Sequence, residues 1–125
     1  MISQLHHVSL LVSDTQRALD FYCDLLGLTQ DSQRPDLGFP GAWLQIGDQQ
    51  IHLLELPNPD PVEGRPAHGG RDRHTAFLVD DIETVKLKLE QAGVPYTLSR
   101  SGRTALFCRD PDMNGIELIE ISRSL

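Results

Sequence analysis

The chain has 125 residues, of which 39% are hydrophobic and 23% are charged, as in an ordinary globular domain. Its formal net charge of −7 argues against a nucleic-acid partner, because nucleic-acid binding requires a basic surface. The N-terminal residues lack the pattern of a signal peptide, no apolar run approaches the ~18 residues that cross a membrane, and two cysteines are too few for a disulfide framework, so we expect a cytoplasmic protein.

The first half of the chain predicts one helix and four strands. Residues 5–12 form a short apolar run typical of a buried strand, and Asp14 after it is a candidate N-cap. An apolar stripe at helical spacing ends at Gly27, which adopts the left-handed conformation without steric cost. The members of this stripe are Ala18, Phe21, Tyr22 and Leu25. The three later strands are expected at residues 30–33, 42–46 and 50–56.

The second half repeats this order after a proline-rich segment. Residues 57–72 contain four prolines and three glycines, a composition that predicts a linker. Residues 74–79 form the next strand. Asp81 is the candidate N-cap of the second helix, and Gly93 ends that helix. The apolar stripe of this helix consists of Ile82, Val85, Leu89 and Ala92. Three more strands are expected at residues 96–99, 105–108 and 116–121, so each half is predicted to be β-α-β-β-β.

Two sequence matches indicate that the halves are copies of one unit. The segment His7-Val-Ser-Leu-Leu-Val-Ser-Asp14 aligns with His74-Thr-Ala-Phe-Leu-Val-Asp-Asp81, and Ile51-His52-Leu53 aligns with Ile116-Glu117-Leu118. One such unit alone would bury little surface. We therefore expect the two units to share a core, or to pair with those of a second chain, and the sequence does not choose between these arrangements.

The repeat selects four polar residues that interrupt apolar strands: His7, His52, His74 and Glu117. A polar group buried in such a strand without a partner would cost kilocalories. Side chains alternate faces along a strand, and the next residues on the faces of His7 and His74 are the small Ser9 and Ala76, which suits a face that lines a cavity. Three imidazoles and one carboxylate predict a site for one divalent metal, with Zn, Ni, Fe and Mn as candidates.

Three other residues compete for the same role. Glu55 lies three residues beyond His52, hence on the opposite face of its strand, and the repeat favours His52. His6 is one residue out of phase with His7, so we expect a structural or outer histidine pointing to the opposite face. His68 lies in the linker and is expected to be exposed.

Three motifs together span nearly the whole chain: His7-x-x-Leu-x-Val-x-Asp14, Phe21-Tyr22-x-x-Leu25-Leu26-Gly27, and Asp110-Pro-Asp leading into Ile116-Glu117-Leu118. They resemble those of the vicinal oxygen chelate superfamily, which includes glyoxalase I, bleomycin resistance proteins and extradiol dioxygenases. The resemblance implies an α+β fold of two paired βαβββ modules whose curved mixed sheet surrounds a metal cleft. It implies a single domain over residues 1–125, with modules at about 1–56 and 73–125, and a homodimer.

The resemblance also implies a metal-dependent glyoxalase-like enzyme, of the lyase or isomerase type, acting on a small oxygenated substrate. The metal positions of the superfamily fall on His7, His52, His74 and Glu117. Glu117 is the only carboxylate among them and is the expected catalytic base. Glyoxalase I enzymes carry Glu where this chain has His52, so we expect weak or absent glutathione-dependent activity.

Substrate contacts are expected from Arg34, Trp43 and Arg103, with Arg109 as a further candidate, because arginine binds carboxylate and phosphate bidentately. Two other functions remain open. The alternatives to the glyoxalase-like enzyme are a metal-free protein that sequesters a ligand, as bleomycin resistance proteins do, and an Fe(II)-dependent extradiol-type dioxygenase. In a dioxygenase, His52 would fill a position that the oxygenase needs open.

Overall fold

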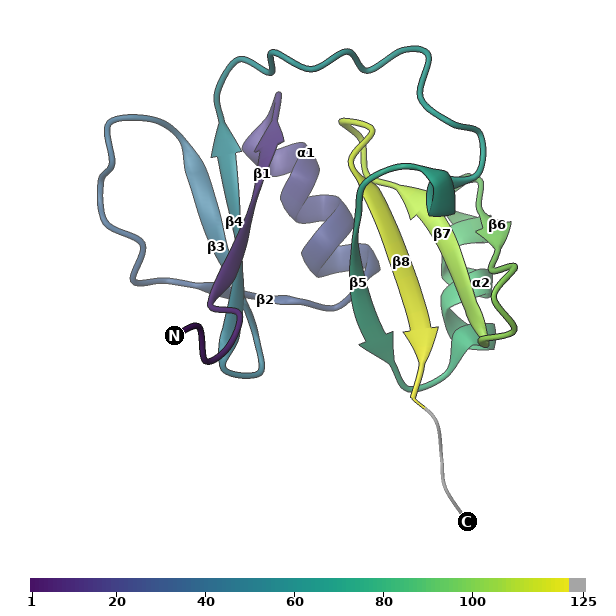
Figure 1. Cartoon of the computed structure of the whole chain (residues 1–125). Coiled ribbons are helices and arrows are strands. Elements are labelled where there is room, and N and C mark those ends of the chain that lie inside the picture. Colours follow the sequence, from purple (N-terminus) through teal and green to yellow (C-terminus); the bar gives the residue numbers. More distant parts are fainter. Residues whose placement is uncertain (122–125) are drawn as a thin grey trace. The chain divides into compact units, whose positions relative to one another are not determined.

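The computed structural model describes residues 1–121 and divides into two compact units, Met1–Asp60 and Pro61–Leu125 (Figure 1). The division falls inside the predicted linker, residues 57–72. Each unit holds one four-stranded mixed sheet. Within residues 1–121, no helix combines the length and apolar character needed to cross a membrane.

The first unit follows the predicted order of elements. The side chain of Asp14 caps the first helix by accepting a hydrogen bond from the backbone N–H of Arg17, and Gly27 has the expected left-handed φ of 83°. The helix changes from α to π geometry after Leu19, where Leu26 N–H donates to the Phe21 carbonyl at 3.0 Å. The elements are β1 (His7–Val12), α1 (Thr15–Leu19), η1 (Asp20–Leu25), β2 (Thr29–Asp31), β3 (Gly41–Ile46) and β4 (Gln49–Glu55).

The second unit repeats this arrangement. Asp81 caps α2 by accepting from the backbone N–H of Glu83 at 3.0 Å, and Gly93 after the helix has a φ of 71°. The elements are η2 (Gly69–Arg71), β5 (His74–Val79), α2 (Ile82–Gln91), β6 (Thr97–Leu98), β7 (Ala105–Arg109) and β8 (Gly115–Glu120). The short 3-10 helix η2 lies in the predicted linker and was not expected.

The two sheets have the same topology. Their strand orders are β1-β4-β3-β2 and β5-β8-β7-β6, with the first and last strands of each unit parallel and all other neighbours antiparallel. A parallel pair needs a crossover connection, which the helix of each unit supplies. The predicted βαβββ modules are therefore confirmed.

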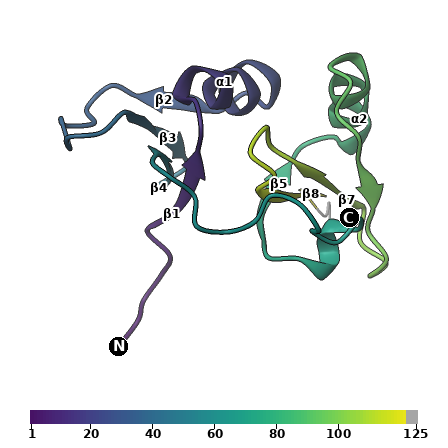
Figure 2. The same cartoon turned by 90° about the horizontal axis from the view of Figure 1, so that it is seen from above.

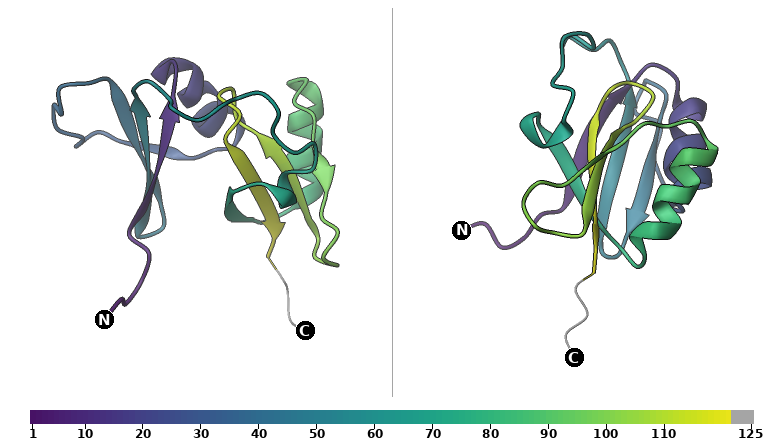
Figure 3. Two further views of the ribbon diagram at one scale, coloured as in Figure 1. Left: turned by 45° about the horizontal axis from the view of Figure 1, so that its top comes forward. Right: turned by 90° about the vertical axis from the view of Figure 1, so that its right-hand side faces the viewer.

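In each unit the helix covers one face of its own sheet and forms the core there (Figures 2 and 3). Alternate residues of the strands point to this face and are buried. In the first unit these core residues are Val12, Ala18, Phe21, Tyr22, Ala42, Leu44, Ile51 and Leu53. In the second unit they are Phe77, Ile82, Leu89, Leu106, Cys108, Ile116 and Leu118.

Two repeat-related glutamates tie the helices to the sheets. Glu55 at the end of β4 accepts hydrogen bonds from the N–H and the hydroxyl of Thr15, at 2.8 and 3.1 Å. Glu120 at the end of β8 accepts from the N–H of Ile82 at 3.2 Å. Free N–H groups at a helix start need such acceptors. Glu55 is thus engaged on the helix-covered face, opposite to His52.

The N-cap of α2 generates the first prediction. Asp81→Ala removes the acceptor for the first turn of the helix, so the free energy of unfolding should fall by about 1 kcal/mol in urea denaturation. Asp80→Ala is the matched control, because Asp80 is exposed and, within residues 1–121, its side chain caps no helix. Equal losses in the two variants would contradict the capping role.

Candidate functional site

The predicted site residues lie on the sheet faces that the helices leave uncovered. Residues paired directly across neighbouring strands share a face. In the first unit, His52 of β4 pairs with Ser9 of β1 and with Trp43 of β3. In the second unit, Glu117 of β8 pairs with Ala76 of β5 and with Phe107 of β7. Equivalent positions of the two sheets therefore hold an imidazole and a carboxylate, each beside an aromatic ring.

In the first unit, the His52 ring lies between two other rings. It stacks on His7, with ring centroids 3.9 Å apart and an interplanar angle of 16°, and on Trp43, at 4.5 Å and 10°. Its Nε2 is 2.8 Å from the Oε1 of Gln50. Stacking on both sides together with this hydrogen bond fixes the plane and the rotation of the imidazole.

The Gln50 amide determines which nitrogen of His52 carries a proton. Nε2 of Gln50 donates to Asp31 Oδ2 at 2.9 Å and to Gln45 Oε1 at 3.0 Å. The side-chain carbonyl oxygen of Gln50 must therefore accept from His52 Nε2–H. The Nδ1 of His52 then keeps its lone pair when the ring is neutral. Burial first, and then the positive charges of neighbouring groups, lower the pKa of His52 below the usual histidine value, which favours the neutral ring.

His6 lies closer to the site than expected. It precedes β1, and its ring meets His7 edge-on with centroids 5.1 Å apart, instead of pointing to the opposite face. Its Nδ1 is 2.9 Å from the Nδ1 of His7. This contact leaves Nε2 of His7 for any further ligand.

Arg34 also belongs to this face. Its Nη2 donates to the carbonyl of Phe39 at 2.9 Å, and a Cβ at Gly41 would come within 3.0 Å of the same nitrogen. Gly41 therefore lets the guanidinium come close to β3, two residues before Trp43. Of the two predicted substrate residues, Trp43 stacks on the His52 ring. Burial is the main cause that lowers the pKa of His52, and the charge of Arg34 adds to it.

In the second unit, His74 contacts Glu117. The Nε2 of His74 is 3.1 Å from Glu117 Oε1, and its Nδ1 is 2.8 Å from the backbone carbonyl of Asp72. Because a carbonyl oxygen only accepts, Nδ1 carries the proton. Glu117 is 5% exposed, and its Oε2 lies 3.6 Å from Nη1 of Arg103. The predicted residues His74, Glu117 and Arg103 thus lie together.

His68 was expected to be exposed, but it lies beside Phe107 of the second unit. It is half-buried, its Nδ1 is 2.8 Å from Thr97 Oγ1, and its ring meets Phe107 edge-on at 5.0 Å. His74 meets the same Phe107 at 5.0 Å. The adjacent pair Gly69-Gly70 was the available signal, because two consecutive glycines permit a close approach to other groups.

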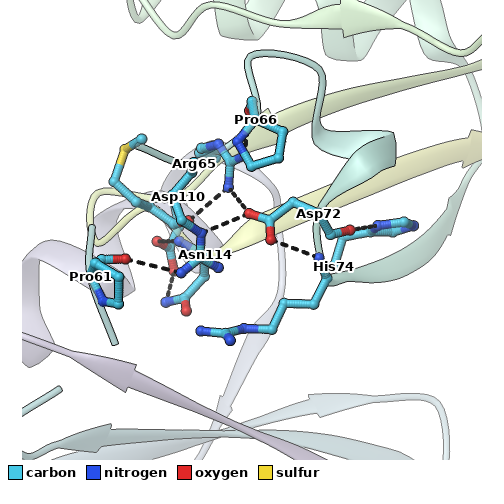
Figure 4. A network of polar contacts seen from close by, with 10 residues as sticks. Pro61, Arg65, Pro66, Asp72, His74, Asp110 and Asn114 are labelled. Atoms are coloured by element: carbon cyan, nitrogen blue, oxygen red, sulfur yellow. Dashed lines mark hydrogen bonds and ion pairs between the residues drawn. The ribbon is translucent and has the colours of Figure 1, made fainter. Parts of the chain in front are cut away.

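Arg109, a candidate for anion binding, donates to Asp72. Figure 4 shows the polar network in which Asp72 lies beside Arg65. Arg109 donates to Asp72 Oδ2 and to the Pro66 carbonyl, both at 2.8 Å, and Arg65 donates to the same Asp72 oxygen at 2.8 Å. These bonds hold the linker on the second unit and position the Asp72 carbonyl that binds His74. The bond from Arg65 is the main cause that lowers the pKa of Asp72 to about 2.

The four predicted metal ligands thus form two pairs, one on each unit. Within residues 1–121, no three His, Cys, Asp or Glu side chains come together as a metal site. Each pair nevertheless keeps atoms that bind a metal when the rings are neutral: Nδ1 of His52, Nε2 of His74 and the carboxylate of Glu117. Nε2 of His7 is not engaged by the contact with His6, which uses Nδ1. A site made by all four residues stays a prediction.

Comparison with known proteins gives consistent matches. Residues 4–118 match the family described as the Glyoxalase/Bleomycin resistance protein/Dioxygenase superfamily. Glyoxylase I 4 of Arabidopsis thaliana is 33% identical over 94% of this chain and 70% of its own length. The lactoylglutathione lyase of Escherichia coli O157:H7 is 34% identical, over 94% and 92% of the two chains. Glutathione transferase FosA of Serratia marcescens is 33% identical, over 94% and 81%.

A solved structure agrees with these matches at the level of the fold. A Bacillus anthracis protein described as a glyoxalase family member has a TM-score of 0.78 and 24% identity, and the match covers 98% of both chains. At this identity the likeness supports the arrangement of strands and helices alone.

The clamp on Asp72 generates a prediction on pH. The pKa of Asp72 is about 2 in the folded protein against 3.8 ordinarily, so its contribution to stability is present above pH 3.8 and is lost as the pH falls towards 2. Asp72→Asn should remove this component, and urea denaturation between pH 4 and pH 2 should show a shallower loss of stability. Asp48→Asn, at an exposed turn, should keep the wild-type pH dependence. An unchanged profile in Asp72→Asn would contradict the clamp.

Proposed function

Because the chain belongs to the glyoxalase/bleomycin resistance protein/dioxygenase superfamily, we propose that it is a glyoxalase-like metalloenzyme of the lyase or isomerase type. Its substrate would be a small molecule that presents two neighbouring oxygens, such as a hydroxyketone or an enediolate precursor. The names of the lyase and transferase relatives are consistent with chemistry on small molecules.

The contact between His74 and Glu117 carries this proposal. Nδ1 of His74 donates to the Asp72 carbonyl, so Nε2 presents a lone pair to a carboxylate oxygen 3.1 Å away whenever the ring carries one proton. Two acceptors at this distance repel unless a proton or a cation lies between them. Nitrogen and oxygen ligands of one divalent ion, each about 2.0–2.2 Å from it, lie roughly 3 Å apart. The pair therefore fits a divalent metal.

The first unit supports the same assignment through its donor atoms. His7 keeps Nε2 and His52 keeps Nδ1, and both imidazoles are held by neighbours that fix their orientation. Outer hydrogen bonds of this kind commonly orient metal-bound histidines. We propose His7 and His52 as the further ligands beside His74 and Glu117, and we propose that the protein acts as a homodimer.

Each side chain has a role in the proposed reaction. A bound divalent ion would supply Lewis acidity to an oxyanion that forms as a neighbouring C–H proton leaves. Glu117 would accept that proton, since it is the one carboxylate of the four and is 5% exposed. Arg103, 3.6 Å from Glu117 Oε2, would hold the carboxylate in place. Trp43 and Arg34 would contact the substrate beside His52.

The metal proposal is tested by elemental analysis of protein purified without added metal. The wild type should contain a stoichiometric divalent metal, and His74→Ala and Glu117→Gln should lower the metal affinity. Changing an outer hydrogen-bonding partner of a ligand costs about 10- to 100-fold in metal affinity, so loss of a ligand should cost at least as much.

Two control variants keep this test specific. Glu63→Gln lies at an exposed linker position, and His68→Asn changes a histidine that contacts neither His74 nor Glu117 directly, so both should keep the metal. A wild-type protein without metal would contradict the enzyme proposal and favour the sequestering function. The His74–Glu117 contact would then be an ion pair of a protonated histidine.

A further prediction concerns glutathione. The wild type should turn over a glutathione hemithioacetal weakly or not at all, because His52 stands where glyoxalase I enzymes carry the second glutamate. His52→Glu should raise this turnover by about 10²-fold, the usual contribution of one proton-transfer group. Rapid turnover by the wild type, measured by formation of the thioester product, would show that the imidazole at this position does not exclude the activity.

A further inference from the structure

Three polar side chains beside His52 form a connected hydrogen-bond network on the uncovered face of the first sheet. Gln45 of β3 and Gln50 of β4 pair directly in the register. Asp31 of β2 pairs with Trp43, which pairs with His52, so Asp31 shares their face. We call Asp31, Gln45 and Gln50 the amide network. Its members are half-buried, where hydrogen bonds are stronger than in bulk water.

Two backbone carbonyls determine how the side-chain amide of Gln45 is oriented. One end of this amide lies 2.8 Å from the Gly47 carbonyl oxygen and 3.2 Å from the Gln49 carbonyl oxygen. Because a carbonyl oxygen only accepts, that end must be the NH₂ group. Oε1 of Gln45 is therefore the end that faces Gln50, and Nε2 of Gln50 donates to it at 3.0 Å.

Asp31 supplies a second, independent anchor for the Gln50 amide. Its Oδ1 accepts from the N–H of Gln33 at 2.9 Å, and its Oδ2 accepts from Nε2 of Gln50 at 2.9 Å. An ionised carboxylate offers acceptors only. Both hydrogens of the Gln50 NH₂ group are thus used, and Oε1 of Gln50 is the atom that faces His52 Nε2, at 2.8 Å.

The rings on either side of His52 oppose the other way of satisfying these contacts. A rotation of the imidazole by half a turn about its Cβ–Cγ bond would exchange nitrogen and carbon positions. The ring centroids of His7 and Trp43 lie 3.9 and 4.5 Å from that of His52, and such close packing on both faces resists the rotation. With the ring held, Nε2 carries the proton of the neutral imidazole and Nδ1 keeps the lone pair.

We propose that Asp31 and Gln45 are positioning residues, which act through Gln50 to make Nδ1 of His52 the nitrogen that binds a metal ion. His74 presents the opposite nitrogen, Nε2, because its Nδ1 donates to a backbone carbonyl. Hydrogen bonds beyond the ligands commonly set the tautomer and the orientation of metal-bound histidines. The metal in this proposal rests on the proposed function; the tautomer of His52 does not.

The imidazole ¹⁵N resonances of chelator-treated protein report the tautomer without any metal. At about pH 8.5, roughly two units above the usual histidine pKa, the rings are neutral. A nitrogen that carries a proton then resonates apart from one that keeps its lone pair, and His52→Gln identifies the signals of His52. We expect a protonated Nε2 and an unprotonated Nδ1 in the wild type. A protonated Nδ1 would overturn the proposal.

Isolated neutral histidine also favours a protonated Nε2, so a variant must show that the amide network is the cause. Asp31→Asn combined with Gln45→Leu removes both acceptors of the Gln50 NH₂ group. The new side-chain oxygen at position 31 keeps the N–H of Gln33 and turns an NH₂ group toward Gln50, whose amide then rotates and donates to His52. The ratio of Nδ1–H to Nε2–H should rise by about tenfold, the usual worth of a hydrogen bond to a charged group.

A matched control separates this effect from damage to the loop. Exposed Asp36 accepts from the N–H of Gly38 at 2.9 Å, as Asp31 does from Gln33, so Asp36→Asn should keep the wild-type ratio. Circular dichroism verifies the fold, and Asp31→Asn alone should shift the ratio in the same direction if the double variant does not fold. An unchanged ratio in the folded variant would overturn the role of the network.

Zinc binding is a separate readout. Zn²⁺ added to the chelator-treated wild type should move the Nδ1 resonance of His52 and leave Nε2 protonated, and Asp31→Asn should weaken Zn²⁺ binding by about tenfold. Coordination through Nε2 of His52 would overturn the assignment of Nδ1. Absence of Zn²⁺ binding would overturn that assignment together with the proposed function, whereas the tautomer ratios would still decide the role of Asp31 and Gln45.

Discussion

Each module depends on the parallel pairing of its first and last strands, β1 with β4 and β5 with β8. This pairing determines which residues face the helix and which face away from it. A slip by one residue would place His52 among core side chains and expose its apolar neighbours, which the burial of Ile51 and Leu53 opposes. The same register sets Trp43 beside His52 and Phe107 beside Glu117. The proposed site is therefore a consequence of core formation on the opposite face.

The duplication explains why Glu55 and Glu120 share one role. Glu55 and Glu120 occupy equivalent positions and both accept hydrogen bonds from the start of a helix, so Glu55 is not a competitor of His52. The equivalence is incomplete at the site itself. His52 is held between two rings and by Gln50, whereas Glu117 is held by a histidine and an arginine. The asymmetry leaves a single carboxylate to serve as a base in the proposed reaction.

The linker both stabilises the second unit and orients a residue of the proposed site. Asp72 joins two arginines through its side chain and orients His74 through its carbonyl, so one residue both anchors the segment and selects the histidine tautomer. The ion pairs are partly buried, where they are screened less than pairs in bulk water. This arrangement uses Arg109 for structure.

Hydrophobic periodicity, turn residues and the repeat were enough to predict both βαβββ modules, the caps Asp14 and Asp81, and the choice of His7, His52, His74 and Glu117 as candidates. These features depend on interactions within a few residues or on matching patterns, which a sequence displays directly. The roles of His68 and Arg109 and the contact of His6 with His7 could not be predicted, nor could the helix-capping role of Glu55. They depend on contacts of loops, linker segments and strand ends with groups that the folded chain brings near, and only the tertiary structure decides which groups those are.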